Sequence, residues 1–309
     1  MITLFAVPKS FKGHTGIIQT NAIKSWKKMK NCEIILMGND SGVREFCTNN
    51  QIKHIPDIKS NKYGTPLISS IFKTAMQEAD SDIMAYVNSD IILLDSFSKS
   101  ISQINFKNYL LIGQRWDLDI VKPINFDNDN YKTKLEKKIK EQGVLHPKTG
   151  IDYFVFPKTV FKKIPDFAIG RTSWDNWLVY NARLNKYPVI NGTQSIDIIH
   201  QNHDYGKFVS NKNLDTRKYK KGIESEVNSK LAGGERYSFN LNDCTHNLIK
   251  GQVIKDTSIK YLLFKIYRLP RLSTKIFPLN HFIDFSFDIL KKTYSIYKKM
   301  KEIVRLKSS

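Results

Sequence analysis

The sequence predicts an α/β fold: a Rossmann-like, mostly parallel central sheet with flanking helices, followed by a C-terminal helical extension. Two observations predict it. In the first 115 residues, short β-branched apolar runs alternate with segments whose apolar residues recur at helical spacing. The last 59 residues are strongly basic and carry a second helical pattern. With 309 residues, 41% of them hydrophobic, the chain can bury a full core and does not have the composition of a disordered protein.

Five apolar runs in the first part of the chain are expected to be strands, with helices between them. The strands are residues 3–7, 33–37, 53–55, 83–87 and 109–113, and the helices are residues 17–29, 42–48 and 66–79. Thr65 is expected to cap the third helix, with Pro66 at its first position. Because strands alternate with helices, we expect parallel pairing with right-handed crossovers.

The second part of the chain is predicted from shorter signals. The polar stretch 117–143 contains a lysine-rich segment, 132–140, that is either a solvated helix or a surface loop. Residues 150–156 and 196–200 are expected strands, and residues 174–184 an expected helix. Residues 206–250 are polar and basic, with Gly233-Gly234 as a hinge, and predict a flexible lid or linker. In residues 281–306, apolar side chains repeat every seven residues beside lysines, which predicts an amphipathic helix.

Charge and cysteine usage limit the function classes. The net charge is +20, and residues 251–309 hold 13 Lys/Arg against 4 Asp/Glu. This tail favours an anionic partner such as a membrane surface, unless lysine is simply abundant throughout. No nucleic-acid-binding motif is present, so no nucleic acid is expected. Three cysteines without a CxxC spacing, no signal-peptide pattern and no apolar run of about 18 residues predict a cytoplasmic protein, peripheral at most on the membrane.

Acidic residues follow two of the predicted strands. Residues 83–87 end in Asn88-Ser89-Asp90, and residues 33–37 lead to Asp40. In open α/β sheets, ligands bind at the carboxyl ends of the strands. A carboxylate there either caps a turn or binds a divalent metal that bridges to substrate phosphates.

These strand ends resemble the GT-A glycosyltransferases that use nucleotide-diphosphate sugars, especially the family-2-like group. The resemblance covers residues 2–204. It implies that Asp40 contacts the nucleotide and that Asn88-Ser-Asp90 stands where the family has its metal-binding DXD motif. The first acid of that motif is replaced here, so Asp90 alone is expected to bind Mn²⁺ or Mg²⁺, and Asn88 to contact the donor.

The resemblance also assigns residues on the acceptor side. Asp152 follows the loop before the strand at 150–156 and is expected to contact the acceptor. Asp175, between Trp174 and Trp177, matches the acid that acts as general base in inverting members. Partial desolvation by the two indoles would raise its pKa, and the indoles could stack on a sugar. In the structural alternative, Asp175 is only a first-turn acid and both tryptophans are core.

Further expected donor contacts and a metal ligand follow the other strands. His200 ends the strand at 196–200 and is expected to complete the metal site, with His203 as the second candidate; either histidine could instead be structural. The remaining donor or nucleotide contacts are expected at Pro8, Phe11, Tyr63 and Arg115, with Gln19 near the base and Asp117 beside Arg115 on the ligand edge.

The resemblance implies a transferase that moves a sugar from a nucleotide-diphosphate donor to a saccharide or lipid-linked saccharide, inverting the anomeric centre, in bacterial cell-surface polysaccharide synthesis. The catalytic domain is expected over residues 1–205, with a nucleotide half to 115 and an acceptor half from 144. Three alternatives stay open: a sugar nucleotidyltransferase, an inactive homologue, and a basic membrane- or nucleic-acid-binding protein.

Overall fold

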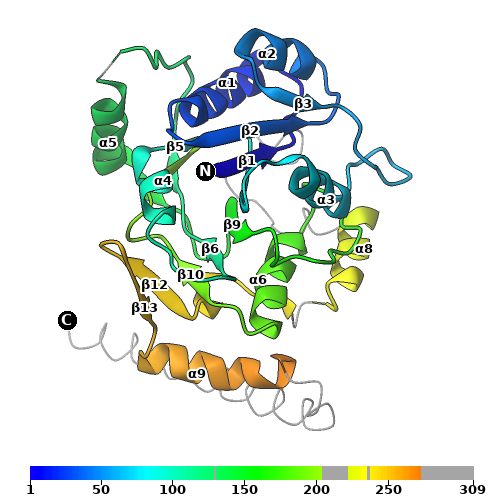
Figure 1. Cartoon of the computed structure of the whole chain (residues 1–309), viewed down its shortest axis with the longest axis vertical. Helices are drawn as coiled ribbons and strands as arrows, with labels where there is room; N and C mark the ends of the chain where they lie inside the picture. The colour runs from blue at the N-terminus through cyan, green and yellow to red at the C-terminus, as the bar shows by residue number, and fades with distance from the viewer. Residues whose placement is uncertain (129, 204–221, 235–236, 273–309) are drawn as a thin grey trace, which may run out of the picture. The chain divides into compact units, whose positions relative to one another are not determined.

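The computed structural model of the chain describes residues 1–128, 130–203, 222–234 and 237–272 (Figure 1). The chain divides into two units, Met1–Asp256 and Thr257–Ser309. The first unit is built on a nine-stranded sheet of order β13-β12-β10-β6-β9-β4-β1-β2-β3. Its strands are β1 (Ile2–Ala6), β2 (Cys32–Met37), β3 (Lys53–Ile55), β4 (Ile83–Val87), β6 (Leu110–Ile112), β9 (Tyr153–Pro157), β10 (Val189–Asn191), β12 (His246–Ile249) and β13 (Gln252–Lys255).

The sheet is largely parallel, as predicted. Neighbouring strands run parallel from β4 through β1 and β2 to β3, and again from β6 through β10 to β12. Between these two parallel blocks lies β9, antiparallel to both β4 and β6. This insertion was not foreseen, because an apolar run does not reveal its direction or its neighbours.

A second, four-stranded sheet has the order β5-β11-β7-β8. Its strands are β5 (Ile91–Leu93), β7 (Trp116–Leu118), β8 (Val144–Leu145) and β11 (Ile198–Gln201). Only β11 was predicted, since the others have two or three residues each. β5 is antiparallel to β11, and β11 is parallel to β7. The turn that leaves β4 therefore leads directly into this smaller sheet.

The described helices flank the strands. They are α1 (Gly13–Lys27), α2 (Val43–Asn50), α3 (Ile68–Glu78), α4 (Asp95–Ile101), α5 (Tyr131–Gln142), α6 (Trp174–Leu184), α8 (Ile223–Leu231) and α9 (Ile259–Arg268). Of these, α1, α2, α3 and α6 were predicted, whereas α4 was not, and α8 lies in the stretch that was expected to be a flexible lid or linker. In α1, the buried side chains Ile18, Ala22, Ile23 and Trp26 form the apolar stripe that the sequence showed. The lysine-rich segment is a helix, α5, which buries Tyr131, Leu135 and Ile139.

The predicted start of α3 was wrong. The helix begins at Ile68, and its N-cap is Leu67 rather than Thr65. Pro66 and Leu67 instead form bridges with Ser60 and Ala168. Pairing across the loop therefore outweighs the local preference of proline for the first helical turn.

The first unit also extends beyond the expected boundary at residue 205. The segment from α8 to β13 belongs to it, and β12 and β13 complete one edge of the large sheet. The expected division at 205 therefore differs from the observed one, which falls after Asp256. Residues 204–221 of the expected lid and the predicted helix at 281–306 lie outside the described residues.

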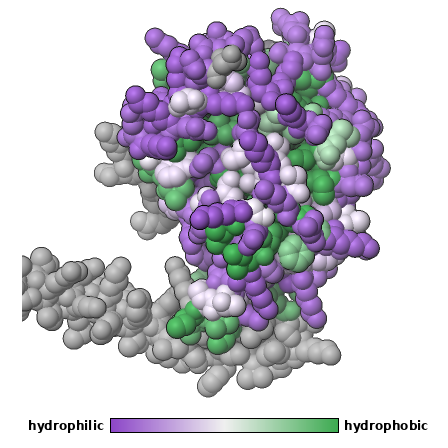
Figure 2. Space-filling model, turned by 60° about the vertical axis from the view of Figure 1, so that its left-hand side comes forward, coloured by the Kyte–Doolittle hydropathy of each residue, from purple (hydrophilic) through white to green (hydrophobic). Residues whose placement is uncertain are grey.

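The surface of the molecule is mostly polar. The face in Figure 2 is largely hydrophilic, with hydrophobic patches among the polar side chains. None of the helices within the described ranges is long and apolar enough to cross a membrane. The main core joins both sheets with α1, through residues such as Leu4, Trp26, Val87, Ile91 and Ile198.

Candidate active site

The turn between β4 and β5 is built by Asn88, Ser89 and Asp90. The backbone N–H of Asn88 donates to the carbonyl of Asp152 at 3.0 Å, which extends the β4–β9 pairing by one residue. The Asn88 side-chain amide donates to the Asp152 carboxylate at 2.7 Å. An aspartate at position 88 could not donate this bond and would place two like charges together. The hydrogen bond to Asp152 on the neighbouring strand thus explains why an asparagine, and not an acid, suits position 88.

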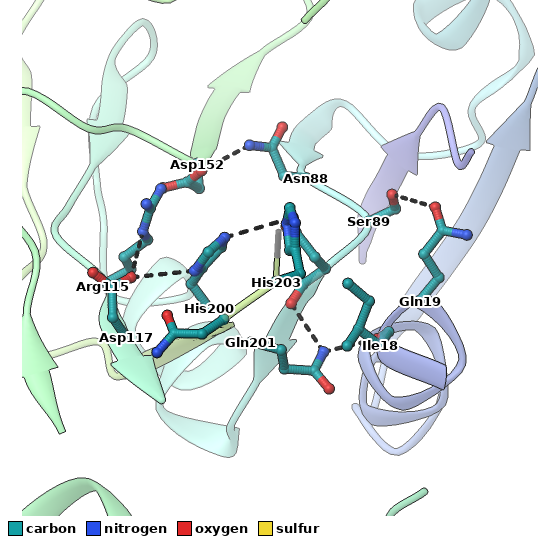
Figure 3. A network of polar contacts seen from close by, with 12 residues as sticks. Ile18, Gln19, Asn88, Ser89, Arg115, Asp117, Asp152, His200, Gln201 and His203 are labelled. Atoms are coloured by element: carbon teal, nitrogen blue, oxygen red, sulfur yellow. Dashed lines mark hydrogen bonds and ion pairs between the residues drawn. The ribbon is translucent and has the colours of Figure 1, made fainter. Parts of the chain in front are cut away.

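Gln201 fixes the turn from the other side. Its amide Nε2 donates to the carbonyl of Asp90 at 3.0 Å and to that of Ile18 at 2.8 Å (Figure 3). Its Oε1 accepts from Asn21 on α1 at 3.0 Å. Gln201 is fully buried, so this network rigidly connects the turn with α1 and β11.

Two histidines converge on Asp90, His200 and His203, which Figure 3 shows from close by. In the β5–β11 pair His200 lies opposite Ile91, so the register brings it beside Asp90. His203 Nε2 lies 2.9 Å from Asp90 Oδ2, and His200 Nε2 lies 3.7 Å from the same oxygen. His200 was the predicted ligand, but His203, the second candidate, is the closer of the two.

The three side chains fit a metal ion. One ligand atom from each of Asp90, His200 and His203 lies within 4.8 Å of the others. Asp90 Oδ1 is buried and has no hydrogen-bond partner among the described residues. A buried carboxylate oxygen without a partner is costly unless a ligand satisfies it.

Asp90 is held in its charged form. Burial raises the pKa of its carboxyl, but the hydrogen bond from His203 and the positive charges of His200, His203 and Arg115 outweigh burial, so the pKa is lowered. The charged carboxylate is the form that binds a metal.

Arg115 connects the turn with β7 and β9. Its buried guanidinium pairs through Nε with Asp117 Oδ1 at 2.9 Å, and through Nη1 with Asp152 Oδ2. His146, directly after β8, also lies 3.3 Å from Nη2. The side chain that we expected on the donor is thus engaged by two acids of the protein.

Asp117 orients His200. The two residues lie opposite each other in the parallel β7–β11 pair, with Asp117 Oδ1 3.2 Å from His200 Nδ1. The second oxygen, Oδ2, lies 2.7 Å from His146 Nδ1. A carboxylate on the far nitrogen of a ligating histidine fixes its tautomer and ring orientation. Asp117 was predicted only to lie on the ligand edge, and His146 was not predicted at all, because the two-residue strand β8 beside it leaves no pattern in the sequence.

The charges of this cluster favour a divalent cation. Three carboxylates, Asp90, Asp117 and Asp152, face one guanidinium, that of Arg115. The formal charge of these four groups is −2, and a divalent ion that replaces the protons on the histidines would neutralise it.

Asp175 lies in the first turn of α6, two residues after Ser173. Its Oδ1 is buried without a hydrogen-bond partner in the described part of the chain. Burial raises the pKa of this carboxyl to about 6, and the negative charge of Asp152 adds to the rise, against hydrogen bonds from the backbone of Asn176 and of Asp175 itself. Asp175 is therefore electrostatically coupled to the metal-binding side of the site.

Trp174 and Trp177 are part of the core. Both are buried: Trp174 packs on Tyr86 and Phe154 at ring distances of 5.3 and 5.5 Å, and Trp177 packs on Phe167 at 5.6 Å. We expected both to contact an acceptor sugar, but the structural alternative describes their position. Asp152, the third expected acceptor contact, is likewise buried and bonded to Asn88 and Arg115.

The loop that enters α6 is held by α8. Fully buried Asn228 accepts from the N–H of Ala168 at 2.9 Å and donates to the carbonyls of Ala168 and Thr172 at 3.0 and 3.1 Å. Ser173 follows with a φ of +84°, a conformation costly for a residue other than glycine. The three hydrogen bonds of Asn228 thus hold the backbone before Asp175 in this conformation.

The other expected nucleotide contacts lie apart from this cluster. Phe11 stacks on Phe46 at 4.4 Å and lines a cavity of about 430 Å³ beside α1 and α2. Pro8 is buried, whereas Asp40 and Tyr63 are exposed in loops, and the described contacts join none of the three to Asp90. Gln19 is the exception, since Ser89 Oγ donates to its Oε1 at 3.1 Å.

Comparisons with known proteins found a match only among solved structures; no family model and no curated protein matches. The chain is similar to a mannosyltransferase from Pyrobaculum calidifontis in complex with GDP-Man and Mn²⁺, at 12% identity and a TM-score of 0.43, over 66% of this chain and 58% of that one. It is also similar to residues 1–349 of S. aureus TarS in complex with UDP-GlcNAc, at 11% identity and a TM-score of 0.42, over 66% and 59%.

A third similar structure is a putative nucleotide-diphospho-sugar transferase from Desulfovibrio desulfuricans, at 13% identity and a TM-score of 0.41, over 75% of this chain and 96% of that one. The chain spans less than two thirds of the first two structures. At these identities and TM-scores the similarity carries no argument about function, for which the geometry of the site is the basis.

Proposed function

We propose that this chain is a GT-A glycosyltransferase that moves a sugar from a nucleotide-diphosphate donor to a hydroxyl acceptor. One observation carries the proposal: Asp90, His200 and His203 converge at the carboxyl end of β4, and the buried Asp90 Oδ1 is left for a ligand. The carboxyl ends of strands in an open sheet are where nucleotides bind. The strand-end motifs resemble those of this enzyme family.

Asp90, His200 and His203 would hold a divalent ion, which supplies charge neutralisation for the departing diphosphate. Two imidazoles and one carboxylate suit Mn²⁺ better than Mg²⁺, since Mg²⁺ prefers oxygen ligands. Asp117 would keep His200 Nε2 directed at the ion, and Arg115 would position the Asp117 and Asp152 carboxylates. The remaining expected donor contacts, at Pro8, Phe11, Asp40, Tyr63 and Asn88, are part of the proposal.

Asp175 would act as general base. Its carboxylate takes the proton of the acceptor hydroxyl while the hydroxyl oxygen attacks the anomeric carbon and the bond from that carbon to the diphosphate oxygen breaks. Attack opposite the leaving group inverts the anomeric centre. A carboxyl with a pKa of about 6 is mostly ionised at neutral pH and is a stronger base than an exposed aspartate.

The proposal also covers the class of acceptor and the place where the enzyme acts. We propose a saccharide or lipid-linked saccharide as acceptor, in bacterial surface-polysaccharide synthesis on the cytoplasmic face of the membrane. The basic balance of residues 251–309, 13 Lys/Arg against 4 Asp/Glu, supports a site of action near anionic lipid.

Thermal-shift measurements with nucleoside diphosphates test the proposal. We expect one nucleoside diphosphate to raise the melting temperature by several degrees in the presence of Mn²⁺, and little or no rise without metal, because a ligand that binds only the folded state stabilises it. Asp90→Asn should lose the metal-dependent part of the shift. Asp57→Asn, which changes an exposed acid outside the cluster, is the matched control and should keep it.

The proposal would be contradicted if no nucleoside diphosphate stabilised the protein with Mn²⁺. Equal stabilisation of the wild type with and without metal would remove the role of the Asp90 cluster but not the nucleotide site.

A further inference from the structure

A short helix of the second unit turns its apolar face to the solvent. In α9, labelled in Figure 1, Ile259, Leu262, Leu263 and Ile266 are 77, 48, 61 and 53% exposed. Their spacing of three, four and seven residues places them on one face of the helix. Tyr261 and Arg268, on the opposite side, are buried. This is the reverse of an ordinary surface helix, which buries its apolar stripe.

Positive charge borders the apolar face. At about 100° per residue, the exposed Lys265 falls beside the stripe. Residues 257–283 contain five Lys/Arg and no acid. An apolar face bordered by an exposed lysine, in a segment without acids, is the pattern of a helix that lies in a membrane interface, with the lysine stem along the acyl boundary and its ammonium group among the headgroups.

We propose that α9 binds the surface of an anionic lipid bilayer, with Ile259, Leu262, Leu263 and Ile266 entering the headgroup–acyl boundary. The inference uses only the second unit and does not depend on the transferase function proposed for the first. Charge complementarity favours an anionic lipid surface as the partner. Its acidic headgroups would neutralise the basic side chains of this segment, while the apolar side chains leave water.

Two other occupants fit less well. A second copy of the chain would bring two lysine-edged faces together, and four apolar side chains fall far short of the roughly 20–30 residues a side of a stable interface. A nucleic acid would engage the lysines but would leave the aliphatic face in water, since such partners are bound through phosphate contacts and base stacking.

Vesicle sedimentation of the full chain tests the proposal. We expect binding to phosphatidylcholine vesicles that contain phosphatidylglycerol, much weaker binding to phosphatidylcholine alone, and a decline with added salt. The double variant Ile259→Gln/Leu263→Gln should weaken partitioning at least about tenfold. Because both side chains are exposed, its melting temperature should stay unchanged. Lys265→Glu should weaken binding to the anionic vesicles only.

The matched control is Val121→Gln/Val144→Gln, which removes two equally exposed aliphatic side chains of the first unit, at 64 and 65% exposure. It should bind vesicles like the wild type. Three results would overturn the proposal. The first is undiminished vesicle binding by the α9 variant. The second is a wild-type dimer that does not bind vesicles and that the α9 variant dissociates, and the third is salt-sensitive retention of the protein on DNA with no binding to anionic vesicles.

Discussion

Asp175 combines a stability cost with a chemical use. Its carboxyl is desolvated by burial, and one oxygen lacks a hydrogen bond within the described structure. The ionised form is therefore less stable in the folded protein than in the unfolded chain, where nothing opposes its charge. Strain and desolvation that persist at one residue are typical of functional sites, where selection maintains them against stability.

Asp175→Asn should stabilise the protein at neutral pH while abolishing transfer. The pKa rises from 3.8 in the reference state to about 6 in the folded state, so the folded protein holds the extra proton between these values. The protonated Asp175 carboxyl therefore contributes to the free energy of unfolding below about pH 4, and this contribution is lost as the pH rises through 6. Removing the charge should raise the free energy of unfolding at pH 7 by about 1–3 kcal/mol, measured by urea denaturation.

The pH dependence separates the chemical role from the structural one. Wild-type transfer, at saturating substrates, should rise with pH through about 6 as Asp175 ionises. Asp57→Asn, which alters an exposed acid, should change neither activity nor stability. Unchanged turnover in Asp175→Asn would remove Asp175 as the base, whatever its effect on stability.

At the scale of elements, what could be predicted depended on the length of the pattern. β4 and α6 have the predicted bounds, because each carries its own apolar pattern and clear ends, and β3 has them although only one of its three residues is apolar. The acid after β4 was predicted to cap a turn or to bind a metal, because it follows a buried strand, and the family resemblance assigned it to the metal. The resemblance also placed His200 and His203 beside that acid, whereas the contact of Asp117 with His200 could not be predicted, because the register of β11 against β7 decides which side chains meet. For the same reason His146 was missed.

Asn228 in α8 should be critical for stability although it is far along the chain from its partners. Asn228→Ala would leave the N–H and carbonyl of Ala168, which is buried, and the carbonyl of Thr172, which is half-buried, without these bonds. Each unsatisfied buried group costs about 1–3 kcal/mol, so we expect a loss of roughly 3 kcal/mol or more in the free energy of unfolding. Urea denaturation measures it.

The same loop precedes Ser173 and Asp175, so Asn228→Ala should also lower the rate of transfer more than the affinity for the nucleotide. Asn185→Ala is the control: it removes an exposed asparagine that bonds only within its own turn of α6, and it should cost about 0.5 kcal/mol or less. A loss of similar size in both variants would mean that α8 does not hold the loop.

For the whole molecule, the observed boundary changes which parts of the chain must fold together. β12 pairs with β10, so residues far beyond 205 complete the sheet that carries the site. Phe239, Leu241 and Leu248 are buried in this first unit. The expected boundary followed the polar composition of residues 206–250, which concealed a few core side chains between many exposed ones.

Truncation distinguishes the two boundaries. A chain of residues 1–256 should melt cooperatively, keep a melting temperature near that of the full protein and retain the Mn²⁺-dependent nucleotide shift, because it holds the entire first unit. A chain of residues 1–205 lacks, among other buried side chains, Phe239, Leu241 and Leu248, which are worth about 1.5–3 kcal/mol each and roughly 5–9 kcal/mol together, against a total stability typically of about 5–15 kcal/mol. It also exposes the edge of β10. We therefore expect it to aggregate or to show no cooperative transition by circular dichroism. If residues 1–205 melted like the full protein, the segment from α8 to β13 would be an appendage after all, and Asn228 could not be the residue that positions Asp175.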